Sequence, residues 1–234
     1  MLPLSIFIIY GSLITYFAIS TNGFDYQPTA EYCIKKCLPI IALAGMVFSG
    51  MTKVGKKYKT IHIWGILFGG IGDFLIAFLH NNLNALVYGA IAFAVGHLLY
   101  MMTFFPKIKH LNKSLSFGVF FAIFSINYFI LFPNFDNEPL PTIIMSIYSI
   151  ILGLCFLGSG SQYMEGSTQY MGGQKFQLFR FIGFSLFLAS DFCLLLANKG
   201  HRHSFSESFI MLTYYGAQLF ITSAMHHEEI LKTR

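Results

Sequence analysis

Eight apolar stretches, each close to twenty residues long, constrain this chain more than any other feature. A helix needs about 20 apolar residues to cross the hydrocarbon core of a bilayer, and backbone groups there must be hydrogen-bonded within the protein. We therefore predict an all-α, polytopic membrane bundle of eight transmembrane helices, forming a single integral-membrane domain over residues 1–234. The expected spans are 3–20, 34–51, 61–79, 82–104, 114–132, 141–158, 176–197 and 206–226.

The composition favours the same class. Only 11% of the residues are charged and 55% are hydrophobic, whereas a soluble domain carries about 25% charged residues. The net charge of +5 comes from basic residues in short loops, a pattern that suits control of membrane topology and argues against nucleic-acid binding. The cysteines form no C-x-x-C pair, so we interpret them as small buried hydrophobic residues. They are Cys33, Cys37, Cys155 and Cys193.

Loop charges predict the orientation of the bundle, because cytoplasmic loops carry an excess of Lys and Arg. Most basic residues fall on one side, namely Lys53, Lys56, Lys57, Lys59, Lys107, Lys109, Lys113, Lys175, Arg180, Lys232 and Arg234. The other side receives Lys35, Lys36, Lys199 and Arg202. We therefore expect both termini to be cytoplasmic.

Two aspartates, Asp73 and Asp191, lie inside expected spans. A carboxylate in hydrocarbon is expensive, and such residues usually serve function. Both spans run outward from the cytoplasmic side. A rise of 1.5 Å per residue places the two carboxyls within roughly one turn of each other in depth. They can meet if the third and seventh spans pack together, which predicts one shared polar site.

The sequence around the aspartates also indicates a faint internal repeat. Gly72-Asp73-Phe-Leu resembles Ser190-Asp191-Phe-Cys, and Tyr88-Gly-Ala resembles Tyr215-Gly-Ala. Such short apolar matches also arise by chance. If they reflect ancestry, spans one to four and five to eight form two parallel four-helix repeats, related by an axis along the membrane normal.

Each aspartate carries two competing interpretations. Asp73 ends the glycine stripe Gly65-xxx-Gly69-xxx-Asp73, so it is either a functional carboxyl or a buried acid on a packing seam. Asp191 is either functional or a structural acid paired with a base. Lys36, at the outer boundary of the second span, is the best candidate for that base.

Polar residues of other spans are also ambiguous. His97 lies among aromatic residues, which is more typical of packing than of catalysis, and its depth puts it away from the aspartates. Tyr214, Gln218 and Thr222 share one helix face at i, i+4 and i+8. Their ridge either bonds to other helices or lines a cavity. Tyr148 is a weaker candidate.

No standard catalytic or metal motif is present in the sequence. There is no GxSxG elbow, no HExxH and no phosphate-binding loop. The stretch His226-His-Glu-Glu229 looks metal-like but is terminal and has no further converging ligands, so we expect no metal site.

An ordered set of motifs resembles a known family. The set comprises Lys36-Cys-Leu-Pro39, Gly72-Asp73-x-x-Leu-Ile, Phe93-Ala-Val-Gly-His97-x-x-Tyr100, Ser185-Leu-Phe187-x-x-Ser190-Asp191 and Tyr214-Tyr-Gly-Ala-Gln218. Together these motifs resemble the YhhN / TMEM86 family of multi-pass membrane proteins, the lysoplasmalogenases. The resemblance covers spans two to eight in the right order.

The resemblance implies hydrolysis of the vinyl-ether bond of a lysoplasmalogen, a lysophospholipid within the membrane. The products are a fatty aldehyde and glycerophosphocholine or glycerophosphoethanolamine. The family's essential acids correspond to Asp73 and Asp191, and its lysine to Lys36. No cofactor is implied. The start of the second span looks like the animal branch, so we expect the endoplasmic reticulum membrane. A homodimer is compatible with the sequence.

The residues are compatible with this chemistry, which needs one protonated acid and one anion, like the carboxylate pair of a glycosidase. We expect Asp191 to be the acid, because its neighbours are bulkier and more apolar; the reverse assignment stays open. Lys36 neutralises the ionised acid or binds the phosphate. Supporting roles fall to Tyr214, Gln218, Asn198, His97 and Tyr100, the first three orienting water and the glycerol hydroxyl.

Two other classes compete with the enzyme. A transporter also uses intramembrane acids, for proton or ion sites. Against it, the proline of the second span, Pro39, is expected near the start of its helix, and no span is broken in the middle by proline. A lipid-sensing protein would bind the lipid without turnover.

Overall fold

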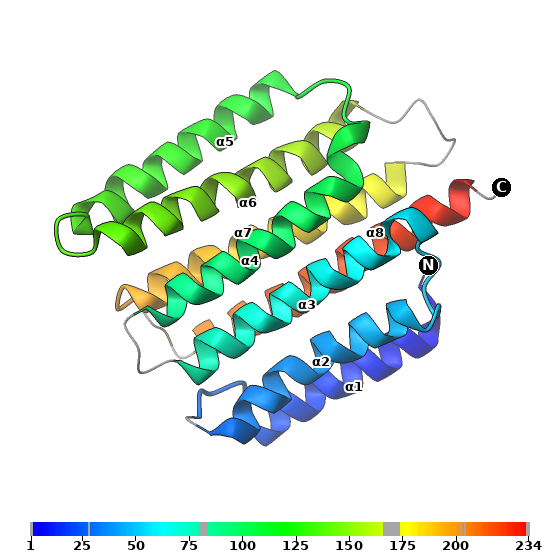
Figure 1. Ribbon diagram of the computed structural model, residues 1–234, viewed down its shortest axis with the longest axis horizontal. Coiled ribbons are helices and arrows are strands. Elements are labelled where there is room, and N and C mark those ends of the chain that lie inside the picture. Colours follow the sequence, from blue (N-terminus) through cyan, green and yellow to red (C-terminus); the bar gives the residue numbers. More distant parts are fainter. Residues whose placement is uncertain are drawn as a thin grey trace.

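A computed structural model describes residues 2–27, 29–79, 84–165, 174–201, 203 and 205–232. The described residues fold into eight α-helices (Figure 1). A one-turn 3-10 helix, η1 (Phe105–Lys107), follows α4. A π-helix, η2 (Asn127–Leu131), and a second 3-10 turn, η3 (Phe132–Asn134), follow α5. The α-helices are α1 (Leu4–Ser20), α2 (Ala30–Phe48), α3 (Lys56–Phe78), α4 (Ala85–Phe104), α5 (Lys113–Ile126), α6 (Pro139–Glu165), α7 (Gln174–Asn198) and α8 (Ser206–Lys232).

Consecutive helices alternate in direction, so both ends of the chain lie at the same end of the bundle (Figure 1). We call this the terminal end and the other the distal end. Among the described helices, five are long and apolar enough to cross a membrane, namely α3, α4, α6, α7 and the segment Lys113–Asn134 that begins with α5. The shorter α1 is also apolar. That all eight helices cross, with cytoplasmic termini, stays a prediction.

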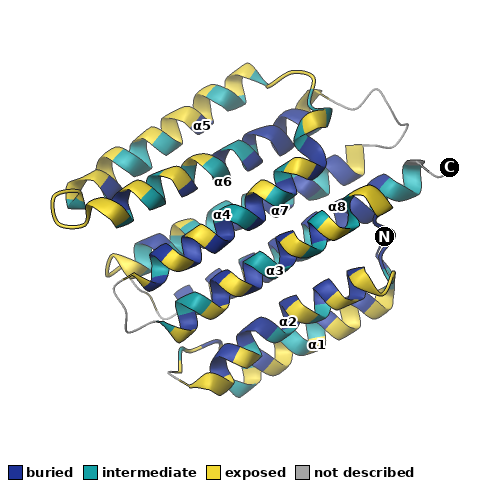
Figure 2. Ribbon diagram, in the orientation of Figure 1, coloured by how far each residue is buried: buried dark blue, intermediate teal, exposed yellow. Residues whose placement is uncertain are grey.

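The order of helix packing is the same in the two halves of the chain. The closest pairs are α3 with α4 and α7 with α8, followed by α2 with α3 and α6 with α7. The outer helices α1 and α5 contact chiefly α2 and α6, and α5 is largely exposed (Figure 2). Asp73 and Asp191 are each the eighteenth residue of their helix. This pattern is what two four-helix repeats predict, and superposition of the halves is its test.

The prediction that the cysteines are buried is confirmed for three of the four. Cys33, Cys37 and Cys155 are buried, Cys193 is partly buried, and all four are unpaired. The expected position of Pro39 is wrong. Because α2 begins at Ala30, Pro39 is its tenth residue and lies in mid-helix, yet the helix is continuous. Arg202, Arg234 and most of the short turn 80–84, which includes the start of the span expected at 82–104, lie outside the described residues.

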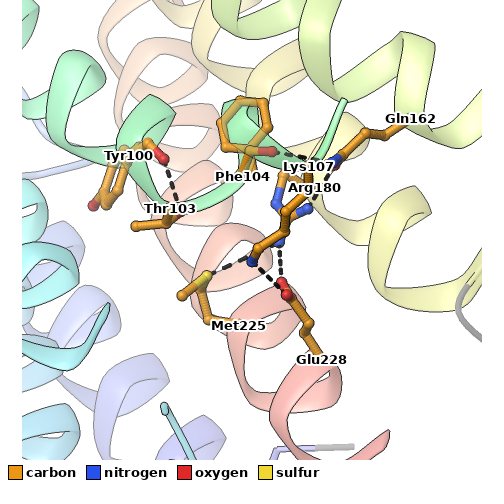
Figure 3. Close-up of polar contacts among 8 residues, drawn as sticks. All are labelled: Tyr100, Thr103, Phe104, Lys107, Gln162, Arg180, Met225 and Glu228. Atoms are coloured by element: carbon orange, nitrogen blue, oxygen red, sulfur yellow. Dashed lines mark hydrogen bonds and ion pairs between the residues drawn. The ribbon is translucent and has the colours of Figure 1, made fainter. Parts of the chain in front are cut away.

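A buried polar cluster joins four segments at the terminal end of the bundle (Figure 3). The Arg180 guanidinium of α7 donates to Glu228 of α8 and to Gln162 of α6, at 2.8 Å each. Glu228 also forms an ion pair with Lys107, which follows α4. The Gln162 amide donates in turn to the Phe104 carbonyl at 3.2 Å. Side chains of Arg180 and Glu228 are only 1% and 4% exposed, so the cluster fixes α4, α6, α7 and α8 relative to one another.

Replacing Glu228 with Gln should destabilise the protein strongly. Breaking a buried pair by removing one charge costs about 3–5 kcal/mol, because the buried Arg180 guanidinium loses its ion pair with Glu228. Thermal unfolding of the purified protein in detergent measures the effect. The matched control is Glu31→Gln, which removes a solvent-exposed ion pair with Lys35 and should leave the midpoint almost unchanged. Equal midpoints for the two variants would contradict the structural role of the cluster.

Candidate functional site

A polar cavity of about 610 Å³ opens between helices toward the distal end. Its lining includes both intramembrane aspartates, Asp73 from α3 and Asp191 from α7, together with Lys36, Tyr214 and Asn198. The prediction that the two carboxyls share one polar site is therefore supported by their common cavity. Five of the eight predicted site residues lie on its wall, and the other three lie behind it.

Asp73 forms one wall with Lys36 of α2. The Lys36 ammonium lies 3.3 Å from Asp73 Oδ1, and both side chains are buried. The backbone at Lys36 is fixed to α8, because the Tyr215 hydroxyl donates to the Lys36 carbonyl at 2.7 Å. This bond lies within the turn before Pro39, where proline leaves the helix one backbone donor short. As a base for a structural Asp191, Lys36 was the wrong candidate, because the lysine lies beside Asp73. Its position agrees with the alternative expectation that Lys36 neutralises the ionised acid of the pair.

The second oxygen of Asp73 faces Tyr214 of α8. The Tyr214 hydroxyl approaches both Asp73 and Gln218, yet neither it nor Asp73 Oδ2 has a hydrogen-bond partner of ordinary geometry among the described residues. Both atoms are buried. A buried polar atom without a partner is costly, so this pair is suited to hold a small polar molecule at the cavity wall.

The glycine stripe of α3 makes room for these side chains. A Cβ atom on Gly69 would lie 2.6 Å from the Gln218 amide nitrogen and 2.8 Å from the Tyr214 hydroxyl. A Cβ on Gly65 would lie 2.5 Å from the Tyr100 ring. The stripe is therefore more than a seam for a neighbouring helix backbone, because it admits polar and aromatic side chains of α4 and α8 beside Asp73.

Asp191 forms the other side of the cavity and has a different partner. The Tyr148 hydroxyl of α6 donates a hydrogen bond to Asp191 Oδ2. The neighbouring Ser190 hydroxyl donates to the Ile210 carbonyl of α8 at 3.0 Å and holds α7 in this rotation. Tyr148 was only a weaker candidate in the sequence, although it is the one tyrosine of the sixth apolar stretch and a buried tyrosine hydroxyl needs a partner.

The two aspartate-bearing helices are not close neighbours, contrary to the expectation that they pack together. The main neighbours of α3 are α2 and α4, and those of α7 are α6 and α8. The rings of Phe93 and Phe187 both pack against Tyr214, at centroid distances of 6.0 and 5.8 Å. Asp73 and Asp191 thus line the same cavity from different helices, separated by aromatic side chains of α4, α7 and α8.

His97 lies closer to the site than its depth suggested. Its Nδ1 is 2.7 Å from the Phe93 carbonyl in the preceding turn, and its ring packs on Phe187 and edge-on against Tyr148 at centroid distances of 4.8 and 5.8 Å. The imidazole therefore supports the tyrosine that binds Asp191. This geometry agrees with the packing interpretation and places His97 behind the cavity wall.

The polar ridge of α8 serves both of its alternative roles. Thr222 and Gln218 bond to other helices, Thr222 to His62 at 3.1 Å and Gln218 to the Tyr100 hydroxyl at 2.5 Å. Tyr214, nearer the distal end, lines the cavity. Tyr100 and Gln218 thus form the layer behind Tyr214.

The metal-like stretch near the C-terminus has structural contacts instead. His226 Nδ1 accepts a hydrogen bond from the Lys53 backbone N–H at 2.8 Å, and Glu228 belongs to the cluster with Arg180. Within the described part of the chain, no group of three or more His, Cys, Asp and Glu residues is placed to hold a metal ion.

Fold and cavity define a multi-pass membrane protein that carries a pair of carboxyl groups inside its helix bundle. The profile of the YhhN family matches residues 32–225, and the chain belongs to this family, which confirms the resemblance noted in the sequence. One similar curated protein is the lysoplasmalogenase TMEM86A of Bos taurus, which is 28% identical over 212 residues, covering 87% of this chain and 82% of the relative. No solved structure matches.

Adding a methyl group beside Asp73 should disturb the cavity wall. A Cβ on Gly72 would lie 2.7 to 2.9 Å from three atoms of the buried Phe93 ring, so Gly72→Ala should cost about 1–3 kcal/mol through overpacking. Thermal unfolding in detergent checks this. The control is Gly45→Ala in α2, where a Cβ meets nothing within 4 Å. If Gly72→Ala is as stable as this control, the Phe93 ring moves away from the added methyl group without loss of stability, and the prediction is wrong.

Proposed function

We propose that this protein is a lysoplasmalogenase, which hydrolyses the vinyl-ether bond of lysoplasmalogens to a fatty aldehyde and a glycerophosphodiester. The observation that carries the proposal is the pair of intramembrane aspartates on one cavity, each with a different partner. Membership of the YhhN family and the similarity to a bovine lysoplasmalogenase support the substrate class.

The different partners assign different roles. Asp73 lies beside an ammonium group, which stabilises a carboxylate anion. Asp191 has no cation within ion-pair distance among the described residues. One of its oxygens accepts from Tyr148, which leaves the other to carry a proton. Asp191 is therefore the general acid and Asp73 the general base.

The reaction starts when Asp191 transfers its proton to the β-carbon of the vinyl ether, which gives an oxocarbenium ion. Asp73 then removes a proton from a water molecule as that water adds to the cationic carbon. The resulting hemiacetal returns its hydroxyl proton to Asp191 while the protonated Asp73 donates to the departing glycerol oxygen. The carbon–oxygen bond to glycerol breaks, the aldehyde forms, and both carboxyls regain their starting states.

The remaining cavity residues position water and substrate. The Tyr214 hydroxyl approaches Asp73 at the cavity wall and, together with this carboxylate, orients the attacking water. Tyr100 and Gln218 hold Tyr214 from behind, and His97 supports Tyr148. All these groups belong to rigid helices, so the water is oriented before the substrate arrives.

The distal mouth of the cavity suits a zwitterionic head group. Lys199, Glu138 and Glu207 line it together with Asn198, so it offers a cation to a phosphate and carboxylates to an ammonium. This mixture fits glycerophosphoethanolamine and glycerophosphocholine alike. In this proposal Asn198, which lines the same cavity, bonds to the free glycerol hydroxyl.

The proposed setting is a membrane that all eight helices cross, with both termini cytoplasmic and the cavity mouth on the luminal side of the endoplasmic reticulum. The shared end of the two termini and the basic loops beside them support this orientation (Figure 1). The mechanism uses side chains and water alone.

Replacing either aspartate should abolish the activity. Asp191→Asn removes the acid and Asp73→Asn the base, and each should lower kcat by roughly 10²–10⁴-fold. Purified protein in detergent is incubated with a 1-alkenyl lysophosphatidylethanolamine and with the matched 1-acyl lipid, and aldehyde and fatty acid are measured. Aldehyde should arise from the alkenyl lipid alone.

The matched control is Asp136→Asn in the exposed turn after η3, which should keep wild-type activity. If folded wild-type protein binds the alkenyl lipid without producing aldehyde, the proposal is wrong and a lipid-sensing role replaces it. Activity that depends on a transmembrane ion gradient would indicate a transporter.

Tyr148→Phe tests the positioning of the acid. Losing a hydrogen bond to a carboxyl group corresponds to roughly ten- to a hundredfold in rate, so kcat should fall by that factor while KM stays the same, because Tyr148 orients Asp191 without binding the head group. The control is Tyr128→Phe on the exposed face of η2, expected to be silent. If KM instead rises by this factor while kcat stays the same, Tyr148 belongs to substrate binding.

A further inference from the structure

A second cavity, of about 340 Å³, lies beside the polar one and is almost entirely apolar. Its described lining comes from α5, η2, α6 and α7, with Leu115, Val119, Leu152, Phe156 and Leu188 among its residues. The polar cavity, in contrast, is lined from α2, α3, α4, α7 and α8. Asp191 is the residue that the two linings share.

We infer that this apolar groove holds the alkenyl chain of the lysolipid, so that the vinyl-ether bond lies at Asp191 between chain groove and head-group cavity. The inference rests on the proposed function and deepens it, because it states where each half of the substrate lies. A vinyl ether has its reactive β-carbon on the chain side and its oxygen on the glycerol side. The two cavities divide at Asp191 in the same way.

The groove is open to a lipid rather than sealed by protein. The main helix contact of α5 is with α6, and α5 shows mostly exposed and half-exposed residues (Figure 2). Its glycine Gly118 lines the groove, and a Cβ on it would meet nothing within 4 Å. Ala122, one turn further, is another small residue on the lining. A chain in the surrounding leaflet can therefore enter sideways past α5.

The direction and length of the groove fit a chain lying along the membrane normal. Tyr148, which bonds to Asp191, lies near its distal end, and Phe156 lies two turns nearer the terminal end. Eight residues of helix separate them, about 12 Å. Gly153 of α6 lies against Val119 of α5, and Gly160 of α6 lies against Leu115 of α5. Gly118, between these two α5 residues, is therefore near the terminal end of the groove. A long chain reaches Gly118 and a short chain does not.

This placement also gives an independent reason for Asp191 to be the acid. Protonation occurs on a carbon of the chain, and Asp191 is the carboxyl group that faces the chain groove. Asp73 lines only the polar cavity, where water and the glycerol oxygen lie. Proton donor and water-activating base therefore act from the two sides of the bond.

Gly118→Phe tests the groove, because it adds a bulky side chain at a groove position where a Cβ meets nothing within 4 Å. Hydrolysis of lysolipids with a hexadecenyl and with a hexenyl chain is compared. The variant should lose roughly ten- to a hundredfold in kcat/KM on the long chain, as expected when the reacting bond is displaced by about an ångström. The hexenyl lipid should react at the wild-type rate. Gly45→Phe, at an equally open glycine of α2, should affect neither.

The inference is overturned if folded Gly118→Phe protein keeps the wild-type ratio of kcat/KM for the two chain lengths. That ratio is kept when both values stay the same and also when both fall by the same factor. A measurement on wild-type protein keeps the test independent of that variant. A saturated 1-alkyl lysolipid, which cannot be hydrolysed, carries a diazirine at its chain end and is photo-crosslinked. Labelling should fall on α5 between Leu115 and Ala122 or on α6 between Leu152 and Phe156.

The two measurements separate failure of the inference from failure of the proposed function. Crosslinks in these segments, without aldehyde production by wild-type protein, would keep the groove as a chain site and reject the enzyme. Aldehyde production with crosslinks confined to other helices would keep the enzyme and reject the groove.

Discussion

The contact between Lys36 and Asp73 is the interaction on which the site depends. An isolated charge inside a membrane-spanning bundle is expensive, and only a partner of opposite charge at short range makes it tolerable. The partner comes from another helix, so the pair fixes α2 against α3 at the depth of the cavity. The bond from Tyr215 to the Lys36 carbonyl connects the same point to α8. Three helices thus converge at the carboxyl group that we propose as the base.

The two intramembrane aspartates occupy corresponding positions in the two halves of the chain but lie in different environments. Asp73 and Asp191 occupy equivalent places in α3 and α7, but the neighbouring helix supplies a lysine in one half and a tyrosine hydroxyl in the other. A cation favours the ionised form of a carboxyl group, whereas a neutral hydroxyl leaves room for a proton on it. Two aspartates at corresponding positions of their helices can therefore play opposite parts in acid–base chemistry.

The helices and the two acidic residues could be predicted from the sequence, because both follow from the free energy of placing a short segment or a single side chain in a bilayer. An apolar stretch long enough to cross a bilayer forms a helix there, and a carboxyl within it stands out. The partners could not be predicted, since they depend on how each helix rotates against its neighbours. Lys36 was therefore a candidate partner of Asp191 as well as of the ionised acid, Tyr148 received little weight, and α3 was expected to pack on α7. Pro39 was misplaced because α2 begins four residues before its apolar stretch.

The cluster of Arg180, Glu228, Lys107 and Gln162 lies far from the chemistry and yet limits how the molecule can move. It joins α4, α6, α7 and α8 at the terminal end, while the cavity lies toward the distal end, where the Tyr148–Asp191 and Ser190–Ile210 hydrogen bonds join α6, α7 and α8. Helices joined in this way can separate at the distal end, with the terminal end as the pivot. In the proposed reaction, a separation of the helices at the distal end would widen the passage beside Asp191 through which the aldehyde leaves, while the cluster stays intact at the terminal end.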